Sequence, residues 1–488
     1  MKMLLSKLIL ICVVVPIHIY AQQLNPEWMK TFGGINDEEG SSVYQTTDGG
    51  FIITGYTNSF GAGNSDVWLI KTDSNGGTTW AKTFGGFAND GGSSVQQTTD
   101  GGYIITGSTS SYGAGNSDVW LIKTDSNGDT LWTKTFGGGN NDYGTAGQQT
   151  SDGGFVIFGA TESFGSGNSD FWLIKTDSNG DNSWIKTFGG AYHDIAFSGE
   201  QTSDNGFIIA GYTQPAGFGN SDVWLVKTDS NGDTLWTKTF GNEFNELAYS
   251  VQQTSDGGYI IAGYTSPGGS IYSDVWLIKT DSNGDTLWTQ TFGGSSTEAG
   301  QSVIETSDNG YIVCGYSYSY TSLGDADVWL IKTDSNGDTT WTRSFGGSDN
   351  EIGFSIDQTT DDGFIVTGST QSYGAGGRDL LLLRLNADGQ TDIDNLESQT
   401  VSSFELKQNY PNPFNPATTI NYSIPSSGYV SLSVYDILGK EVATIVNEYK
   451  NAGSYSTIFD SNGLTSGVYL YRLQSGNFDS IKKFILVK

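Results

Sequence analysis

Carboxylates are the chemically active side chains that recur most regularly in this sequence. One acid follows each of seven TFGG-like strings at a fixed distance, and an aspartate recurs further along in the same way. Acids gathered on one rim could bind a cation or accept hydrogen bonds from a ligand. The first set is Glu38, Asp90, Asp142, Asp194, Glu246, Glu298 and Glu351, and the second is Asp66, Asp118, Asp170, Asp222, Asp274, Asp327 and Asp379.

Distances decide how such acids can be used. Neighbouring β-sheets stack about 10 Å apart, whereas calcium takes oxygen ligands at about 2.3–2.6 Å. Seven short side chains spread over such a rim therefore cannot meet at one ion. We expect structural hydrogen bonds, with a separate calcium site in each repeat as the alternative and no other cofactor. Any ligand contacts of this rim are assigned to the first set of acids and to His193.

Imidazole and thiol groups are scarce. The sequence has two His and two Cys, of which only His193 and Cys314 lie beyond residue 21. This inventory excludes a Cys/His zinc site there. His193 stands beside Asp194 and could act as a general base, but no nucleophile accompanies it. We therefore predict a surface loop residue and no catalytic residues. Cys314 aligns with Thr106 and Ala210, which predicts a buried small residue.

Aromatic residues of the longer loops offer a second kind of contact. Their rings could stack on sugar rings, or they could pack against the rim of the protein. These residues are Tyr112, Phe164, Phe218, Tyr272, Tyr320 and Tyr373.

Internal repeats must position all of these groups. The TFGG-like strings begin at residues 31, 83, 135, 187, 239, 291 and 344, so they are 52 residues apart five times and then 53. All 13 Trp follow the same spacing. Each repeat contains four segments rich in β-branched and aromatic residues, which in the second repeat are SSVQQTT, YIITGST, DVWLIKTD and DTLWTKTF. This composition predicts four strands per repeat.

The two ends of the repeat region indicate its arrangement. It starts with a fourth strand alone, EWMKTF around Trp28, and ends after three strands, the last being DLLLLRLN at 379–386. Together with six complete repeats these make 28 strands, or seven four-stranded units. A first strand that completes the last unit is how a β-propeller hides its edge strands. We therefore predict an all-β chain with a seven-bladed β-propeller at residues 22–390.

Hairpin register predicts which side chains face each other. The Asn127-Gly128 pair favours a type I′ turn between the third and fourth strands, and it places Lys123 opposite Trp132. Such a pair is predicted to form a cation–π contact that belongs to the scaffold. The equivalent pairs are Lys71 with Trp80, Lys332 with Trp341 and Arg384 with Trp28.

Loops divide the predicted propeller into two faces. The DGG and SNGD hairpins scarcely vary and share one face, the constant face. The loops between repeats, such as NDEEG, ANDGG, NNDYG and YHDIA, differ and share the other, the variable face. Ligand contacts are expected on the variable face. The DSNGD loops lack the further spaced ligands and the closing Glu of an EF-hand, so hairpin turns are expected there.

The first 21 residues have the features of a secretory signal. Lys2 and Lys7 are followed by an apolar stretch at 8–15, and cleavage is predicted between Ala21 and Gln22. No other apolar run approaches the length of a transmembrane segment. With 53 acids against 23 Lys and Arg, the net charge of −30 argues against binding to nucleic acids.

The composition changes after residue 390. Residues 391–404 are polar and are predicted to be a linker. Residues 405–488 contain four of the eight Pro and no Trp, and their short strands with turn signals suggest a small β-sandwich. Strands are predicted at 429–436 and 468–473, and IKKFILVK is the last segment.

This last region closely resembles the type A C-terminal sorting domain of the type IX secretion system of Bacteroidota-like bacteria. The matching motifs are YPNPFNPATTINYSIP (410–425), VSLSVYDILGKEV (430–442), GLTSGVYLYRL (463–473) and KKFILVK (482–488). The resemblance implies passage through the type IX translocon to the outer surface of a Gram-negative bacterium or into the medium. It also implies a sortase-like enzyme as a partner of residues 405–488. The repeats, with RLNADG at 384–389, resemble delta-sixty-type extracellular propeller repeats.

Three functions are consistent with this sequence. The one we favour is an exported, non-catalytic binding or adhesion module that takes a glycan or a protein on its variable face. The second is a polysaccharide hydrolase or lyase, since two carboxylates about 5–9.5 Å apart can cleave a glycosidic bond. The third is a structural matrix or display protein. Catalysis is less expected because the acids recur in every repeat, whereas an enzyme needs unique groups in one or two repeats.

Overall fold

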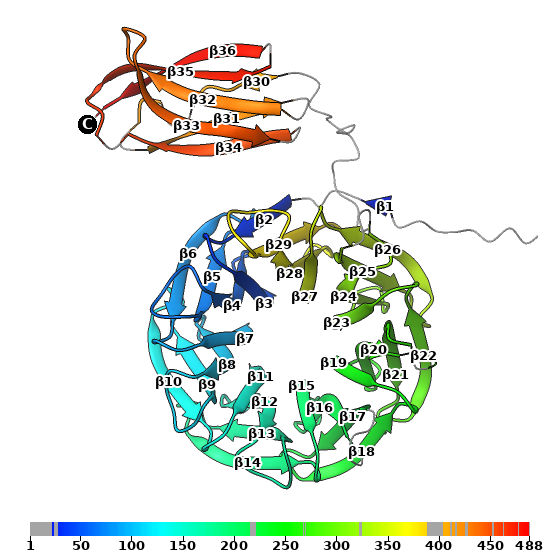
Figure 1. Cartoon of the computed structure of the whole chain (residues 1–488). Coiled ribbons are helices and arrows are strands. Elements are labelled where there is room, and N and C mark those ends of the chain that lie inside the picture. The colour runs from blue at the N-terminus through cyan, green and yellow to red at the C-terminus, as the bar shows by residue number, and fades with distance from the viewer. Residues whose placement is uncertain are drawn as a thin grey trace, which may run out of the picture. The chain divides into compact units, whose positions relative to one another are not determined.

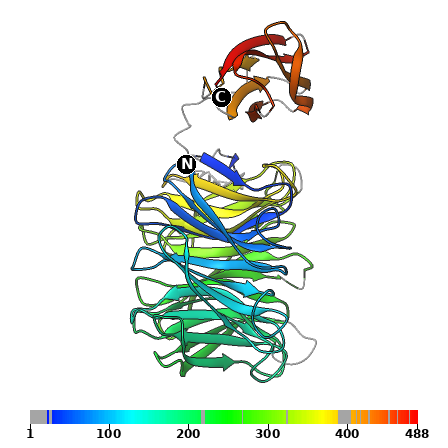
Figure 2. The ribbon, with the colours of Figure 1, turned by 90° about the vertical axis from the view of Figure 1, so that its left-hand side faces the viewer.

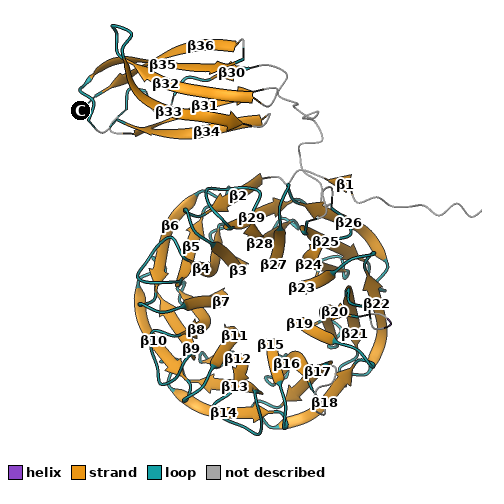
Figure 3. Cartoon of the chain, in the orientation of Figure 1, coloured by secondary structure: helices purple, strands orange, loops and turns teal. Residues whose placement is uncertain are grey.

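The structure is a computed structural model, and it describes residues 22–23, 28–214, 221–266, 268, 270–321, 325–387, 404–409, 412–414, 417–424, 428–450, 453–461, 463–476 and 478–487. The chain divides into two compact units, Met1–Asp392 and Ile393–Lys488. Every named element within the described residues is a strand (Figure 3). The described chain is therefore all-β, as the sequence predicts.

Strands of the first unit follow the repeats. The first four are β1 (Gln22–Gln23), β2 (Trp28–Phe32), β3 (Glu38–Gln45) and β4 (Phe51–Thr57). The next are β5 (Asp66–Thr72), β6 (Thr78–Phe84), β7 (Asp90–Gln97), β8 (Tyr103–Thr109), β9 (Asp118–Thr124), β10 (Thr130–Phe136), β11 (Asp142–Gln149), β12 (Phe155–Thr161), β13 (Asp170–Thr176), β14 (Asn182–Phe188), β15 (Asp194–Gln201) and β16 (Phe207–Thr213). The last are β17 (Asp222–Thr228), β18 (Thr234–Phe240), β19 (Glu246–Gln253), β20 (Tyr259–Thr265), β21 (Asp274–Thr280), β22 (Thr286–Phe292), β23 (Glu298–Glu305), β24 (Tyr311–Ser317), β25 (Asp327–Thr333), β26 (Thr339–Phe345), β27 (Glu351–Gln358), β28 (Phe364–Thr370) and β29 (Asp379–Leu385).

Within the described residues these strands form seven antiparallel sheets, numbered here along the chain. Sheets I to V are β3–β6, β7–β10, β11–β14, β15–β18 and β19–β22. Sheet VI is β23–β26 and sheet VII is β27–β29 with β2. The pairing of β2 with β29 places Trp28 opposite Arg384. In addition, β1 pairs in parallel with β26, a contact that the sequence did not predict.

The sheets lie around a common centre. The first strand of each sheet is nearest the centre and the fourth is at the outside (Figure 1). Viewed edge-on, the loops gather on two opposite sides of the strands (Figure 2). Because consecutive strands are antiparallel, the loops between sheets and those between second and third strands share one side. This side is the variable face, and the hairpins lie on the constant face.

Burial of these strands follows their composition. In β9 all seven residues are buried, as its DVWLIKT run predicts for a strand covered on both faces. In β10 exposed and half-buried residues alternate, because only one face of this outer strand is covered. Leu121 and Ile104 of sheet II pack in one cluster with Phe155 and Ile174 of sheet III. The hydrophobic core is thus repeated between neighbouring sheets.

The hairpins between third and fourth strands differ from the predicted type I′ turn. In the second repeat φ is positive at Gly128 (78°), and a type I′ turn would need a positive φ at Asn127 as well. Asp125 N donates to Asp129 O at 2.9 Å, and the register shifts beside the turn. Oδ1 of Asp125 also accepts from Asn127 N at 2.8 Å. The aspartate side chain therefore organises a longer turn that ends in a bulge.

The second unit consists of two sheets that share one core. Its strands are β30 (Glu405–Leu406), β31 (Ala417–Ile424), β32 (Gly428–Tyr435), β33 (Glu441–Lys450), β34 (Gly453–Asp460), β35 (Gly467–Ser475) and β36 (Phe478–Leu486). One sheet is β30-β31-β34 and the other is β33-β32-β35-β36. Tyr422 of the first sheet packs in one cluster with Leu432, Tyr471 and Phe484 of the second. The three predicted strands correspond to β32, β35 and β36.

Two predicted segments lie outside the described residues. These are the signal segment at 1–21, which includes Ala21, and the predicted linker at 391–404 except for its last residue. Gln22, on the far side of the predicted cleavage point, is in β1. Among the described residues, none forms a helix with the length and hydropathy of a membrane span.

Candidate functional site

The first set of predicted acids lies at the start of the first strand of each sheet, and all seven acids are buried. Asp90 accepts hydrogen bonds from Gly86 N at 2.9 Å, from Ser111 Oγ at 2.6 Å and from Thr109 Oγ1. A carboxylate bonded in this way ties the connection between two sheets to the following sheet. The bond from the amide four residues earlier recurs in all seven sheets, with Gly34, Gly86, Gly138, Gly190, Asn242, Gly294 and Gly347 as donors.

These bonds occupy oxygens that a cation would need. Within the described part of the chain, no three His, Cys, Asp or Glu side chains are grouped so as to hold a metal ion. Calcium has oxygen ligands from several groups at once. These contacts are the structural hydrogen bonds that the sequence predicts, and a separate calcium site in each repeat stays an alternative for a binding measurement to test.

Acids of the two sets face each other across a glycine of the TFGG-like string. A Cβ on Gly137 would lie 1.6 Å from Oδ1 of Asp118 and 3.0 Å from Oδ2 of Asp142. Because glycine has no side chain, the two carboxylates can approach. Oδ1 of Asp118 has no hydrogen-bond partner among the described residues. At the equivalent place, burial and the nearby charge of Glu351 raise the pKa of Asp327 to about 7.

The register predicted between third and fourth strands is confirmed. Each basic residue lies opposite the Trp expected from the sequence. The confirmed pairs are Lys71 with Trp80, Lys123 with Trp132, Lys332 with Trp341 and Arg384 with Trp28.

For Lys71, Lys123 and Lys332 the predicted cation–π contact is wrong, because each ammonium pairs with a carboxylate instead. Nζ of Lys123 lies 2.9 Å from Oδ2 of Asp100, in the DGG hairpin of the same sheet, and donates to Thr124 O at 2.9 Å. Burial alone would raise the pKa of Asp100, but hydrogen bonds from Thr98 and Lys123 outweigh it and lower the pKa to about 2. At contact distance an ammonium is attracted more strongly by the full charge of a carboxylate than by the quadrupole of a ring. These ion pairs belong to the constant face.

His193 lies in the connection between sheets III and IV. Its Nδ1 is 3.0 Å from Ser169 Oγ, and its Nε2 is 3.4 Å from Asn168 Nδ2. Ser169 is a hydroxyl partner that the sequence analysis did not identify. It is only 2% exposed, so a substrate cannot reach it as a nucleophile. The contacts of His193 join two loops.

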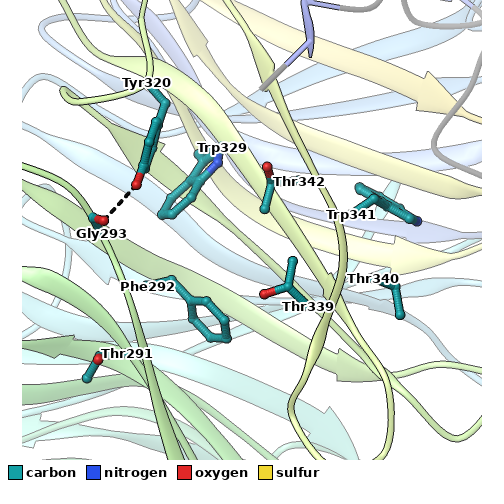
Figure 4. A pocket seen from close by; sticks show the side chains of 9 residues that line it. All are labelled: Thr291, Phe292, Gly293, Tyr320, Trp329, Thr339, Thr340, Trp341 and Thr342. Atoms are coloured by element: carbon teal, nitrogen blue, oxygen red, sulfur yellow. Dashed lines mark hydrogen bonds between the residues drawn. The ribbon is translucent and has the colours of Figure 1, made fainter. Parts of the chain in front are cut away.

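The aromatic residues of the longer loops pack on the rim. Tyr320 lies 4.9 Å from Trp329 between ring centroids, and its Oη donates to Gly293 O at 2.7 Å (Figure 4). With Phe292 and Trp341 these rings line a cavity of about 310 Å³ beside β22 and β26. The tyrosine therefore fastens sheet VI to sheet V.

This packing recurs in other repeats. Tyr112 lies 5.3 Å from Trp120, and Phe164 lies 5.7 Å from Trp172. Oη of Tyr373 donates to Gly346 O at 3.0 Å. Of the remaining predicted loop aromatics, Tyr272 is exposed and Phe218 lies outside the described residues. The repeated loop rings thus serve the scaffold.

A hollow of about 500 Å³ opens on the variable face over three consecutive sheets. Its lining includes Tyr56 from β4 of sheet I, Gly91 and Ser108 from β7 and β8 of sheet II, and Tyr143 from β11 of sheet III. Sheet II lies between the other two (Figure 1). The volume lies within the range of small-molecule sites.

Small residues of sheet II explain why the hollow is there. Gly91 lies opposite Ser108 in the register, whereas the same pair of positions holds Leu247 and Tyr264 in sheet V. A Cβ on Gly91 would meet nothing within 4 Å. In sheets IV and V aromatic rings fill this region, since Tyr249 lies 6.0 Å from Tyr264 between ring centroids. The hollow therefore results from a local departure from the repeat.

Polar, uncharged groups dominate the rest of the lining. Amides and hydroxyls come from Asn58, Asn89, Asn141, Ser65, Ser110 and Ser117, and no Lys or Arg is among the described lining residues. Asp90 also lines the hollow, with its carboxylate bonded as described above. Burial raises the pKa of Tyr143, and the charge of Glu162 raises it further, so its phenol stays neutral at neutral pH.

The structure separates the predicted binding residues from this hollow, with one exception. Asp90 lines it, whereas the other six acids of the first set and His193 are not among its lining residues. The tyrosines and asparagines were missed because each is ordinary within its own repeat. The available signal was the pair Gly91 and Ser108, because no other repeat combines a glycine at the first position with a small residue at the second.

Comparisons with known proteins identify the second unit. Residues 408–488 match the family described as a secretion system C-terminal sorting domain. Over an alignment of 157 residues the chain is 29% identical to the regulatory protein FlaEY of Caulobacter vibrioides, and the match covers 27% of this chain and 16% of that protein. The chain thus spans a small part of that relative.

Two solved structures show how limited the similarity of the whole chain is. PorZ, an essential surface component of the type IX secretion system of Porphyromonas gingivalis, has a TM-score of 0.43 at 11% identity, over 94% of this chain and 60% of PorZ. Sqt1 of Chaetomium thermophilum has a TM-score of 0.44 at 12% identity, over 75% of this chain and 100% of Sqt1. The motifs of the second unit and the family match together lead to one conclusion: the chain is a secreted or cell-surface protein that carries the C-terminal sorting domain of the type IX secretion system beside repeated, propeller-like β-sheets.

Proposed function

We propose that this protein is exported by the type IX secretion system of a Gram-negative bacterium and acts outside the cell as a non-catalytic binding module. The observation that carries the binding role is the hollow on the variable face. The proposed organisation is a signal peptide at 1–21, a seven-bladed β-propeller at 22–390, a linker at 391–404 and the sorting domain at 405–488.

Contacts between the first and last sheets support a closed propeller. Glu38 N of sheet I donates to Arg378 O, next to sheet VII, at 2.7 Å. Thr360 N of sheet VII donates to Oε1 of Gln45 at 2.8 Å. Equivalent bonds join neighbouring sheets elsewhere, as Asp90 N donates to Ser65 O at 2.8 Å. β2 also pairs with β29 and completes sheet VII. With these bonds, sheet VII contacts sheet I in the way that other neighbouring sheets contact each other, as expected in a closed ring of blades.

The proposed export route has a direct test. The translocon would recognise residues 405–488, and a sortase-like enzyme would remove them during attachment to the surface. Deleting residues 408–488 in a bacterium that has this system should leave the protein in the periplasm. Export of the shortened chain at the normal level would overturn this route.

Binding would use the variable face, because charged side chains of the constant face are already paired with each other. The lysines there are paired with aspartates, as Lys123 is with Asp100. On the variable face the loops differ between repeats, which is typical of a surface that recognises a ligand. The hollow adds to this face a concave site whose described lining is polar and carries a single carboxylate, that of Asp90.

The test of the binding role is saturable binding by the purified full chain. It would be labelled and applied to an array of glycans and to mucin, fibronectin and collagen as protein ligands. Saturable binding to any of these supports the proposal. A folded chain that binds none of them would favour the structural or display role.

A polysaccharide hydrolase or lyase is the alternative that the same samples test. New reducing ends or unsaturated ends on any polysaccharide would overturn the non-catalytic role. The bonded state of Asp90 and its equivalents argues against it, because a catalytic carboxylate must be available to exchange a proton with substrate.

A further inference from the structure

The hollow over sheets I, II and III has a chemistry that indicates its ligand. Its side chains are hydroxyls, amides and two tyrosines, together with one carboxylate that is already bonded. Amides and hydroxyls both donate and accept hydrogen bonds, as the hydroxyl groups of a sugar do. This argument rests on the proposed binding function and names the class of ligand.

Charge excludes the acidic ligands. None of the described lining residues is Lys or Arg, and the nearby Arg378, which bonds to the side chain of Tyr56, is already paired with Glu39 at 3.0 Å. The chain as a whole has a net charge of −30. A phosphate, sulfate or uronate would enter a negative field without a counter-charge. A cation would compete with protein donors for Asp90, whose oxygens accept from Gly86 N and Ser111 Oγ. A neutral ligand suits this site best.

Backbone groups near the hollow are paired, which argues against an extended peptide. Asp90 N donates to Ser65 O at 2.8 Å, and Ser110 N donates to Asn89 O at 2.9 Å. Asp142 N donates to Ser117 O at 2.7 Å. A peptide that adds a strand needs free N–H and C=O groups at a sheet edge. Recognition in the hollow therefore depends on side chains.

The two tyrosines provide the apolar part of the site. Tyr143 is 40% exposed, and Tyr56 is half-buried in the adjoining wall. A sugar ring has an apolar C–H face and a polar rim, so it can contact a tyrosine ring with one and amides with the other. Gly91 leaves the space between these walls open, because a Cβ there would meet nothing within 4 Å.

From these observations we propose that the hollow binds an uncharged carbohydrate chain, with Tyr56 and Tyr143 contacting the sugar rings and Asn89 and Ser108 bonding to sugar hydroxyls. Gly91 determines whether the ligand can enter. Its substitution by leucine introduces the side chain that Leu247 has at the same position of sheet V.

Titration calorimetry of the full chain tests this proposal with defined probes. These are cello-, manno-, xylo- and laminari-tetraose as neutral ligands and tetragalacturonate as the charged one. At least one neutral tetrasaccharide should bind, and the charged one should not. Binding of a neutral ligand should be insensitive to added salt, because no ion pair forms.

Three variants locate the site. Gly91→Leu should abolish binding, and Tyr143→Ala should weaken it by about tenfold or more. Tyr143→Phe should lose less affinity for the tetrasaccharide than Tyr143→Ala, because it keeps the aromatic ring. Gly139→Leu is the matched control, since Gly139 lies on the same face, outside the hollow, and its added Cβ would also meet nothing within 4 Å. Unchanged Trp fluorescence and unfolding midpoints would show that each variant is folded.

The outcomes separate this proposal from the broader one. Carbohydrate binding that survives Gly91→Leu, or binding of tetragalacturonate alone, would overturn the carbohydrate site and leave the binding function intact. A protein ligand on the array that Gly91→Leu abolishes would also overturn the carbohydrate class, while keeping the hollow as the site. Failure of every ligand in both assays would overturn both proposals.

Discussion

Replacing Asp327 by asparagine should stabilise the repeat region at alkaline pH and leave it unchanged at acidic pH. Asp327 is 4% exposed, and a Cβ on Gly346 would lie 1.8 Å from its Oδ1 and 2.9 Å from Oε2 of Glu351. Burial, followed by the charge of Glu351, raises the pKa of Asp327 to about 7. Ionised Asp327 is therefore a buried charge that faces a second carboxylate.

The sign and size of the effect follow from proton linkage. A folded-state pKa above the ordinary 3.8 means that the folded chain binds this proton more tightly than the unfolded chain. The resulting stability is fully present below pH 3.8 and is lost as the pH rises through about 7. Three pKa units at 1.36 kcal/mol each correspond to about 4 kcal/mol. Asparagine cannot ionise, so Asp327→Asn should avoid this loss.

Urea unfolding followed by Trp fluorescence measures the effect, because all 13 Trp lie in the repeat region. The native chain and Asp327→Asn should unfold alike near pH 4, and the variant should become more stable by up to about 4 kcal/mol near pH 8. Asp338→Asn is the control, since it removes one charge from the exposed hairpin of the same sheet. If the free energy of unfolding depended on pH equally in the native chain and in Asp327→Asn, the argument that ionisation of Asp327 beside Glu351 destabilises the fold would be refuted.

Other measurements address the constant face, the interblade acids and the thiol. Lys123→Met should cost about 1–3 kcal/mol because it removes a buried donor to Thr124 O and the ion-pair partner of Asp100. Lys82→Met, at an exposed pair, should cost less than about 1 kcal/mol. Equal urea midpoints for the two variants would contradict this difference. The pKa of Asp100, about 2, lies below the ordinary 3.8, so the stability that Asp100 contributes is present above pH 3.8 and is lost as the pH falls through about 2. Lys123→Met should reduce this acid-side slope without abolishing it, because the bonds from Thr98 and Gly102 remain. Addition of calcium followed by a chelator should leave the melting temperature unchanged, because Asp90 and its equivalents already accept protein hydrogen bonds. A rise in melting temperature with calcium would instead indicate a separate metal site in each repeat. Burial raises the pKa of the Cys314 thiol, so iodoacetamide should label it only after unfolding, as mass spectrometry would show.

Local patterns explain which parts of the fold were predictable. The strand pairs β8–β9 and β9–β10 follow from alternating or continuous apolar residues and short hairpins, and these are properties of about ten consecutive residues. The register of Lys123 and Trp132 was predictable for the same reason. The turn type was not, because the side chain of Asp125 bonds to the backbone of the turn and lengthens it.

Partners that are distant in sequence were the source of the errors. The ammonium of Lys123 could not be assigned to Asp100 from the strand pair alone, since the aspartate belongs to the hairpin between the first and second strands. Likewise, Ser169 comes within 3.0 Å of His193 only because two loops meet between sheets. A buried cation selects its partner from the whole neighbourhood, which the sequence does not display.

The repeated strands, the hairpin register and the sorting domain were predictable, because each depends on contiguous residues or on a motif that matches a family. The position of the hollow was not, because it depends on how neighbouring sheets pack. The hollow exists because Gly91 and Ser108 of one sheet lie between Tyr56 and Tyr143 of its two neighbours, and these four residues come from three different repeats. The sequence gives the size of each side chain, but the packing of the sheets decides which side chains become neighbours and therefore where a hollow remains.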